Sequence, residues 1–202
     1  MLVTGIKSKP VYAPLQADTR GRCHLMLGMG VGAAPLLRVI AEMGTAAPKG
    51  LQNTHVLFVP DAGTAGEVER FRAAVGSVQA FPSTPALLGE FRSTLGRALM
   101  GTRLYVAGPE SFIGLVMKIA LEFNLNKDEI RAEECGTLAR RVYCIHCRAT
   151  TENVRTNIVR CVECGRWLLV RDHYSRRLAA YMGVMVDAEA PGELPQLVEV
   201  FL

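Results

Sequence analysis

Four cysteines in the C-terminal third of the chain have a spacing that predicts metal chemistry. Cys144 and Cys147 form one C-x-x-C pair, Cys161 and Cys164 form another, and 13 residues separate the two pairs. A C-x-x-C turn can direct both sulfur atoms to one point, so two such turns can complete a tetrahedron of thiolates. The pattern predicts a metal site that suits zinc, with rubredoxin-type iron as the alternative. A closed four-thiolate zinc site would be structural, because it leaves no position for water or substrate.

The remaining cysteines and the neighbouring histidine are expected to take no part in this site. Cys23 and Cys135 fall at strand positions, where a lone cysteine usually packs as a small apolar side chain. His146 lies inside the first C-x-x-C pair. Because four thiolates already complete the ligand set, its ring is expected to be exposed.

Two glycine-containing loops form a second candidate site, which would bind a nucleotide. The first loop, GMGVGAAP, supplies Gly28, Gly30, Gly32, Ala33 and Pro35. The second loop, AGPESF, supplies Gly108, Pro109 and Glu110, and Asp61 follows a strand between the loops and could contact a ribose. Glycines let the backbone approach a phosphate closely, and the N-terminus of a following helix offers free N–H groups.

The spacing of the glycines leaves a purely structural role open. The dinucleotide fingerprint G-x-G-x-x-G would place its third glycine where this chain has Ala33, and no Lys-Ser/Thr pair follows as in a P-loop. The glycines could therefore serve only to pack a strand tightly against a helix. Asp61 and Glu110 have equally ordinary explanations, as a turn residue and a helix-start residue.

Alternating strand and helix signals surround the two loops. Apolar runs typical of strands occur at residues 23–28, 54–60, 77–82, 102–108 and 129–135. Segments with helical spacing separate them, at residues 35–43, 65–76, 85–100 and 109–124. This alternation predicts an α/β fold with a mostly parallel sheet and right-handed crossovers. Ligands bind such a sheet beyond the carboxyl ends of its strands, where both loops fall.

A change in charge near residue 136 indicates two domains. Residues 136–187 carry nine arginines, no lysine and four acidic residues, whereas the preceding part is close to neutral. We expect an α/β domain of nucleotide-binding type over residues 1–135. A small four-cysteine domain of the zinc-ribbon or rubredoxin type, with a C-terminal tail, should occupy residues 136–202. Within it, residues 166–185 should begin as a strand and continue as a helix.

The composition predicts a soluble, cytoplasmic protein. Half of the residues are hydrophobic, which is enough for a packed core, and the N-terminus lacks the apolar stretch of a signal peptide. The most apolar region, residues 24–43, is interrupted by glycines, a proline and charges, and so it does not predict a membrane span. Disulfides are rare in the cytoplasm, which favours metal binding by the cysteine pairs.

Residues 20–135 resemble the pyridine-nucleotide half of the ferredoxin reductase superfamily. The resemblance rests on the first glycine loop and on the stretch LYVAGPESFIGLVMKIALEFNLNKDEI, residues 104–130. It implies a crevice for NAD(P)H, but this chain has Ala107 where the family has a cysteine beside the nicotinamide. Only about 22 residues precede the first expected strand, too few for the family's flavin-binding barrel. A bound nucleotide would therefore have no hydride acceptor within this sequence, and we expect weak binding.

Residues 141–189 are similar to the C-terminal part of the small subunit of bacterial dimethylamine monooxygenase, also described as haem-dependent oxidative N-demethylase. The two-domain layout extends this resemblance over nearly the whole chain. It implies a complex that oxidises dimethylamine to methylamine and formaldehyde with dioxygen and NAD(P)H. Haem is then expected on another subunit, and flavin and iron–sulfur centres on a reductase subunit. The chain itself would be a non-catalytic accessory subunit with structural zinc, supporting docking or electron transfer.

Two alternatives from other functional classes remain open. The arginines of the four-cysteine domain would suit a zinc ribbon that binds nucleic acid, although they are scattered among acidic residues. A stand-alone nucleotide-binding oxidoreductase is the other, although no Ser-His-Asp grouping or carboxylate pair marks a catalytic centre. The tail LPQLVEVFL, residues 194–202, could add a strand to a partner sheet or pack on its own domain.

Overall fold

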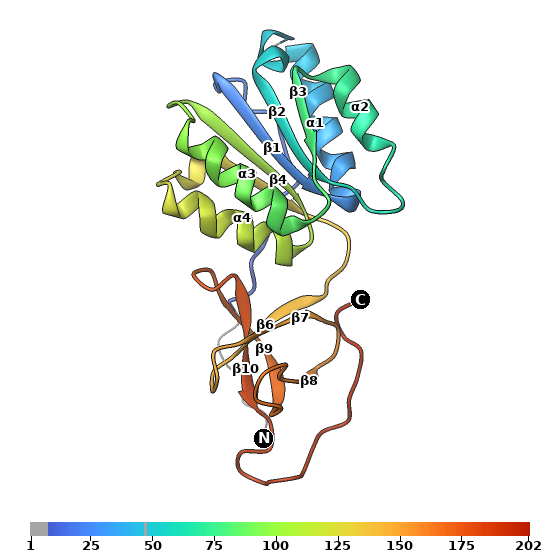
Figure 1. Ribbon diagram of the computed structural model, residues 1–202, viewed down its shortest axis with the longest axis vertical. Helices are drawn as coiled ribbons and strands as arrows, with labels where there is room; N and C mark the ends of the chain where they lie inside the picture. The colour runs from blue at the N-terminus through green and yellow to red at the C-terminus, as the bar shows by residue number, and fades with distance from the viewer. Residues whose placement is uncertain (1–7, 47) are drawn as a thin grey trace. The chain divides into compact units, whose positions relative to one another are not determined.

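The computed structural model describes residues 8–46 and 48–202, which form two compact units (Figure 1). Tyr12–Gly136 make up the first, which we call the α/β unit. Thr137–Leu202 make up most of the second, which we call the four-cysteine unit.

The described residues before Tyr12 belong with the four-cysteine unit, whereas the sequence placed them in the α/β domain. The reason is a set of hydrogen bonds made by Ser8. The N–H group of Ser8 donates to the carbonyl oxygen of Asp172 at 3.0 Å, and the N–H group of Tyr174 donates to the Ser8 hydroxyl at 2.9 Å. The four-cysteine unit is therefore assembled from both ends of the chain.

A five-stranded, fully parallel sheet forms the centre of the α/β unit, in the order β3-β2-β1-β4-β5. Its strands are β1 (Cys23–Met29), β2 (Thr54–Val59), β3 (Ser77–Ala80), β4 (Thr102–Gly108) and β5 (Ile130–Glu134). The connecting helices are α1 (Ala33–Ala46), α2 (Glu67–Ala74), α3 (Thr84–Gly96) and α4 (Glu110–Glu122). Short 3-10 turns are η1 (Gly30–Gly32), η2 (Pro48–Asn53) and η3 (Lys127–Glu129). The expected parallel α/β fold is confirmed.

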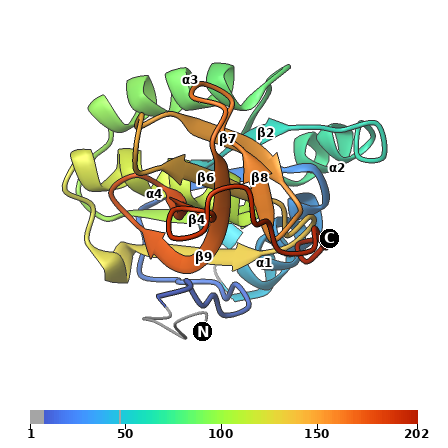
Figure 2. The same cartoon turned by 90° about the horizontal axis from the view of Figure 1, so that it is seen from below.

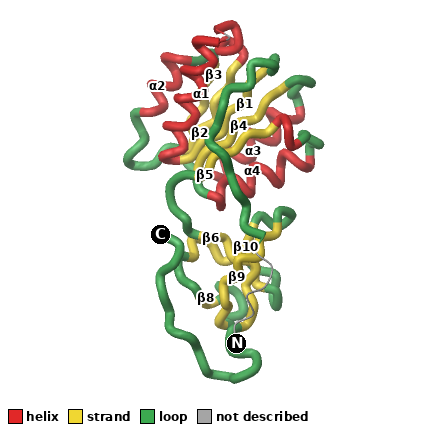
Figure 3. The backbone as a smooth tube through the Cα atoms, turned by 180° about the vertical axis from the view of Figure 1, so that it is seen from behind, coloured by secondary structure: helices red, strands yellow, loops and turns green. Residues whose placement is uncertain are grey.

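Two separate hydrophobic cores hold the helices against the sheet. Helices α1 and α2 pack on one face, and α3 and α4 pack on the other, as Figure 1 shows. The loop that precedes β1 also crosses the α1 face of the sheet (Figure 3). Its Leu15 side chain is 2 % exposed and packs in the same core as Tyr105 of β4. Because this segment covers β4, no helix is needed on that part of the face.

The four-cysteine unit is a second five-stranded sheet, in the order β7-β6-β10-β9-β8. Figure 2 shows this unit from below. Its strands are β6 (Arg140–Cys144), β7 (Thr150–Val154), β8 (Ile158–Arg160), β9 (Trp167–Ser175) and β10 (Ala180–Met185). All neighbours are antiparallel except β6 and β10, which are parallel.

The expected helix after β9 is wrong, because β9 and β10 form an antiparallel pair over that stretch. Tyr174 and Tyr181 face each other across the two strands with ring centroids 5.0 Å apart. A Cβ atom on Gly183 would lie 2.7 Å from a Val142 methyl group, so glycine is what allows β10 to lie against β6.

Within the described residues, no helix is both long and apolar enough to cross a membrane.

Candidate metal centre and nucleotide-type crevice

The first C-x-x-C pair lies in the tight turn between β6 and β7. The Cys144 N–H donates to the Ala149 carbonyl oxygen at 2.9 Å, and the Arg148 N–H returns a bond to the Cys144 carbonyl oxygen at 2.9 Å. Arg148 has a φ of 69°, which is left-handed and closes the turn.

The second C-x-x-C pair repeats this geometry between β8 and β9. The Cys161 N–H donates to the Arg166 carbonyl oxygen at 2.9 Å, and the Gly165 N–H donates to the Cys161 carbonyl oxygen at 3.1 Å. Gly165 has a φ of 67° at the position equivalent to Arg148, and glycine adopts this conformation without steric cost. The two turns are therefore matched knuckles, each shaped by its own local hydrogen bonds.

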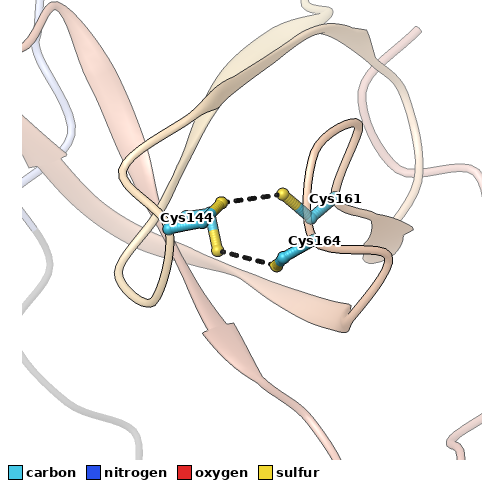
Figure 4. A group of neighbouring side chains, drawn as sticks. Cys144, Cys161 and Cys164 are labelled. Carbon is cyan, nitrogen blue, oxygen red and sulfur yellow. Dashed lines mark hydrogen bonds between the residues drawn. The ribbon is translucent and has the colours of Figure 1, made fainter.

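The sheet brings the two knuckles together, so that all four sulfur atoms lie within 4.8 Å of one another (Figure 4). The Sγ atoms of Cys144 and Cys164 are 3.8 Å apart, and those of Cys147 and Cys161 are 3.4 Å apart. A tetrahedral site with metal–sulfur bonds of about 2.3 Å requires sulfur–sulfur separations of about 3.8 Å. The cluster thus has the size and the donor atoms of a closed four-thiolate metal site.

The electrostatics of the cluster favour a bound cation. The main-chain N–H group and then the guanidinium of Arg166 lower the pKa of Cys164 to about 6, so one thiolate forms readily. The N–H of Ala149 favours the thiolate of Cys147 too, but desolvation and the neighbouring sulfur atoms raise its pKa to about 12. Four negative charges cannot gather here alone, because each thiolate opposes the next. A metal cation would remove that opposition by displacing the protons.

The side chains expected to stay outside the metal site do so. His146 is exposed on the first knuckle. Cys23 and Cys135 lie in the α/β unit and are half-buried. Burial raises the pKa of both thiols, that of Cys135 to about 11, which makes them poor nucleophiles at neutral pH.

The two glycine-containing loops meet at the centre of the parallel sheet. β1 and β4 are neighbours, and their carboxyl ends lead to helices on opposite faces, which is the topological switch point of such a sheet. The chain turns from β1 through η1 into α1, and from β4 through Pro109 into α4. The structure therefore brings the two loops to the place where open α/β sheets bind ligands.

The glycines of the first loop are also required by packing within the chain. A Cβ atom on Gly32 would lie 2.2 Å from the carbonyl oxygen of Ala107, and one on Gly28 would lie 2.8 Å from a methyl group of Leu36. Gly30 has a φ of 54°, in the left-handed region. Each glycine thus has a structural reason to be present before any ligand is considered.

The other predicted residues of the crevice have defined places. Ala33 and Pro35 lie in the first turn of α1, and both are buried. Pro109 precedes α4, and its carbonyl oxygen accepts from the N–H groups of Phe112 and Ile113. The side chain of Glu110 is buried in the first turn of α4, where the helix dipole favours a negative charge.

Asp61, which follows β2, reaches the glycine loop. Its Oδ1 atom accepts hydrogen bonds from the Gly63 N–H at 3.0 Å and from the Thr64 hydroxyl at 2.8 Å. Its Oδ2 atom lies 2.5 Å from the point that a Cβ atom on Gly30 would occupy. A carboxylate fixed at this point would accept hydrogen bonds from ribose hydroxyls and repel a phosphate placed there.

Sequence reasoning missed a charge cluster around the buried side chain of Asp18, near the N-terminal ends of β4 and β5. The Asp18 carboxylate forms salt bridges with Arg20 at 2.8 Å, with Arg103 at 3.2 Å and with Arg131 at 3.5 Å. The bonds from Arg20, followed by those from Arg103, hold the pKa of Asp18 well below its usual range despite burial. Two of these partners lie far from Asp18 in sequence, so no local spacing could have shown them.

Both domains of the chain match models of one known protein family. Residues 4–130 match the N-terminal domain, and residues 141–184 match the C-terminal domain, of the family described as dimethylamine monooxygenase subunit DmmA-like. The chain belongs to this family. It is also 33 % identical over 184 residues to the heme-dependent oxidative N-demethylase delta subunit of Ectopseudomonas mendocina (strain ymp), covering 91 % of each chain.

Solved structures similar to this member of the DmmA-like family match it less closely. The flavohem-like FAD/NAD binding domain of nitric oxide dioxygenase from Vibrio cholerae is 19 % identical, with a TM-score of 0.43 over 63 % of this chain and 55 % of that one. The Amycolatopsis cytochrome P450 reductase GcoB is 15 % identical, with a TM-score of 0.44 over 58 % of this chain and 38 % of that one. An intact type IV self-sufficient cytochrome P450 monooxygenase has a TM-score of 0.47 and 14 % identity over 68 % of this chain. The chain spans only 19 % of that protein's length.

Proposed function

We propose that the chain is an accessory subunit of an oxidative N-demethylase, which converts dimethylamine to methylamine and formaldehyde with dioxygen and NAD(P)H. The observation that carries this proposal is the match to a delta subunit over 91 % of both chains. Membership of the DmmA-like family over both domains supports it. On this proposal haem, flavin and iron–sulfur centres belong to the other subunits, and this chain supports docking or electron transfer.

The four-cysteine centre holds structural zinc in this proposal, with Cys144, Cys147, Cys161 and Cys164 as ligands. The separations of the sulfur atoms support a tetrahedron, and four thiolates would leave no open position for substrate. Bound zinc would contribute folding free energy to a unit with a small core of its own. The main-chain hydrogen bonds that shape the knuckles would hold the four thiolates around the metal.

The crevice between β1 and β4 has a structural use first and binds a pyridine nucleotide weakly in this proposal. Its predicted contacts are Gly28, Gly30, Gly32, Ala33, Pro35, Asp61, Gly108, Pro109 and Glu110. The position at the switch point supports nucleotide binding, whereas the packing of Gly32 on Ala107 accounts for one glycine without a ligand. Asp61 would accept hydrogen bonds from the ribose, and a flavin on a partner subunit would take the hydride.

Purification of the chain alone tests the metal assignment. We expect close to one zinc per chain by elemental analysis, and a colourless protein. Cys161→Ser should lose the metal, while Cys135→Ser, which changes a cysteine in the other unit, should retain it. A red, iron-containing protein would show that the site binds rubredoxin-type iron instead of zinc. Metal retained equally by both variants would refute the site.

Nucleotide titration and reconstitution test the subunit role. The chain alone should bind NADH or NADPH weakly, oxidise neither, and restore dimethylamine oxidation only when combined with the other subunits. Asp61→Ala should change the nucleotide affinity. Because it also removes the turn hydrogen bonds from Gly63 and Thr64, the stability of the α/β unit is measured alongside. Substantial unaided NAD(P)H oxidation would instead support a stand-alone oxidoreductase. A DNA or RNA affinity that falls steeply with salt would support the zinc-ribbon alternative.

A further inference from the structure

The C-terminal tail, residues 194–202, pairs with the connection between β7 and β8 of its own unit. The Asn157 N–H donates to the Val198 carbonyl oxygen at 3.0 Å, and the Val200 N–H donates to the Arg155 carbonyl oxygen at 2.8 Å. The tail is thus held along one edge by an antiparallel pairing within its own unit, which is one of the two arrangements that its alternating apolar residues allowed.

The opposite edge of the tail is open. Glu199 lies opposite Thr156 in an antiparallel bridge. The hydrogen bonds of this bridge are made by the flanking residues, Val198 and Val200 on the tail and Arg155 and Asn157 on the connection, and not by Glu199 or Thr156 themselves. The N–H and C=O groups of Glu199, and of Leu197 two residues earlier, therefore point away from the β7–β8 connection. Within the described part of the chain, these four groups have no hydrogen-bond partner.

Exposed apolar side chains flank this open edge on both faces of the tail. Leu197 is 52 % exposed, Val198 is 45 % exposed and Val200 is 51 % exposed. Phe201 alone is buried, with its ring 3.8 Å from the guanidinium carbon of Arg140. One residue and a row of main-chain bonds therefore anchor the tail, while its other apolar side chains remain 40–66 % exposed. Clustered exposed apolar residues of this kind mark protein contacts.

We infer that this edge, residues 196–200, accepts an extended, apolar segment of another subunit as an added strand. Free N–H and C=O groups along an extended backbone are satisfied by another strand, and the flanking apolar side chains select a strand that is also apolar. Of the four edge strands in the two sheets, β5 and β7, with the sequences IRAEE and TTENV, carry mainly polar side chains, and β3 and β8 are only four and three residues long. The inference rests on the proposed function, in that it requires the chain to work within an assembly.

A proline substitution tests the added strand directly. Glu199→Pro removes one outward N–H group but none of the bonds to residues 155–157, and proline is tolerated on edge strands. The matched control Glu199→Ala removes the same side chain and keeps the N–H group. Each variant is co-expressed with the other subunits of the oxidative N-demethylase. We expect Glu199→Pro to weaken its association with them about fivefold or more, and Glu199→Ala to associate as the wild type does.

Hydrogen exchange gives a second readout that does not depend on a variant. In the isolated wild-type chain, the Val200 amide should exchange slowly and the Leu197 and Glu199 amides quickly. In the assembly, the Leu197 and Glu199 amides should also slow, by about tenfold or more. Slowing in the isolated chain that depends on its concentration would identify a second copy of this chain as the added strand, and would overturn the proposed partner.

The outcomes separate this inference from the proposed function. If the assembly forms with Glu199→Pro as tightly as with Glu199→Ala, and the two amides exchange at unchanged rates, the inference is refuted while the accessory role stands. If the wild-type chain fails to associate with the other subunits at all, the proposed function is refuted, and the added strand with it.

Discussion

Replacing Gly32 by alanine tests whether the glycine loop is required for packing rather than for a ligand. The added Cβ atom would lie 2.2 Å from the carbonyl oxygen and 2.6 Å from the carbonyl carbon of Ala107. Both are backbone atoms of a central strand with neighbours on either side, so neither can move without disturbing the sheet. Overpacking of this kind costs about 1–3 kcal/mol, and we expect about 3 kcal/mol because the clash is with backbone. The melting temperature of the α/β unit should fall by about 12 °C.

Two spectroscopic signals report separately on the two units. All four α-helices described lie in the α/β unit, so circular dichroism at 222 nm follows its unfolding. The single tryptophan, Trp167, lies in the four-cysteine unit, and its fluorescence follows that unit. Gly32→Ala should shift the first transition and leave the second in place.

Gly89→Ala is the matched control for this experiment. Gly89 lies within α3, and a Cβ atom there would meet nothing within 4 Å. Alanine should therefore stabilise the helix by about 0.5–1 kcal/mol. If Gly32→Ala proved as stable as the wild type in the absence of nucleotide, the packing explanation would be refuted. A ligand would then be the better reason for glycine at this position.

Three further predictions concern other parts of the molecule. Cys161→Ser, or removal of the metal by a chelator, should lower the fluorescence transition and leave the helical one unchanged; a shift in the helical transition alone would contradict the assignment. The depressed pKa of Asp18 means that the unfolded chain binds its proton at higher pH than the folded chain. The α/β unit should therefore be most stable above pH about 4 and lose stability as the pH falls below it; Asp18→Asn should flatten this dependence, and an unchanged acid profile would count against it. Arg140→Lys should lose the stacking of the guanidinium on the ring of Phe201 and destabilise the four-cysteine unit by about 1–2 kcal/mol, measured by fluorescence in urea. Equal stability of wild type and Arg140→Lys would show that the stacking contributes nothing.

The features that the sequence predicted well are those set by local spacing. The C-x-x-C knuckles are closed by hydrogen bonds that span only four or five residues, as from Arg148 to Cys144, so the spacing of the cysteines is enough to reveal them. The strands of the α/β unit are also clear, because their burial on both faces produces continuous apolar runs such as THVLFV in β2. The order of strands and helices then favours a parallel sheet.

Features that depend on distant residues were missed or misjudged. The stretch in β9 and β10 was expected to turn into a helix, and it is a strand pair because Tyr174 and Tyr181 pack across it. Ser8 and Asp172 lie at opposite ends of the chain and yet share a hydrogen bond. No pattern along the chain predicts such long-range contacts, because they depend on which surfaces remain unburied once the strands have formed.

The amino-acid sequence by itself determined the two matched knuckles, the alternation of strands and helices, and the family, since each follows from short-range spacing or residue type. Only the tertiary structure decided that the four sulfur atoms converge within 4.8 Å, that Asp61 lies over the glycine loop, and that the tail keeps one edge open. The physical reason is that these juxtapositions arise from sheet pairing and core packing. Both bring together residues whose separation along the chain carries no signal of their contact.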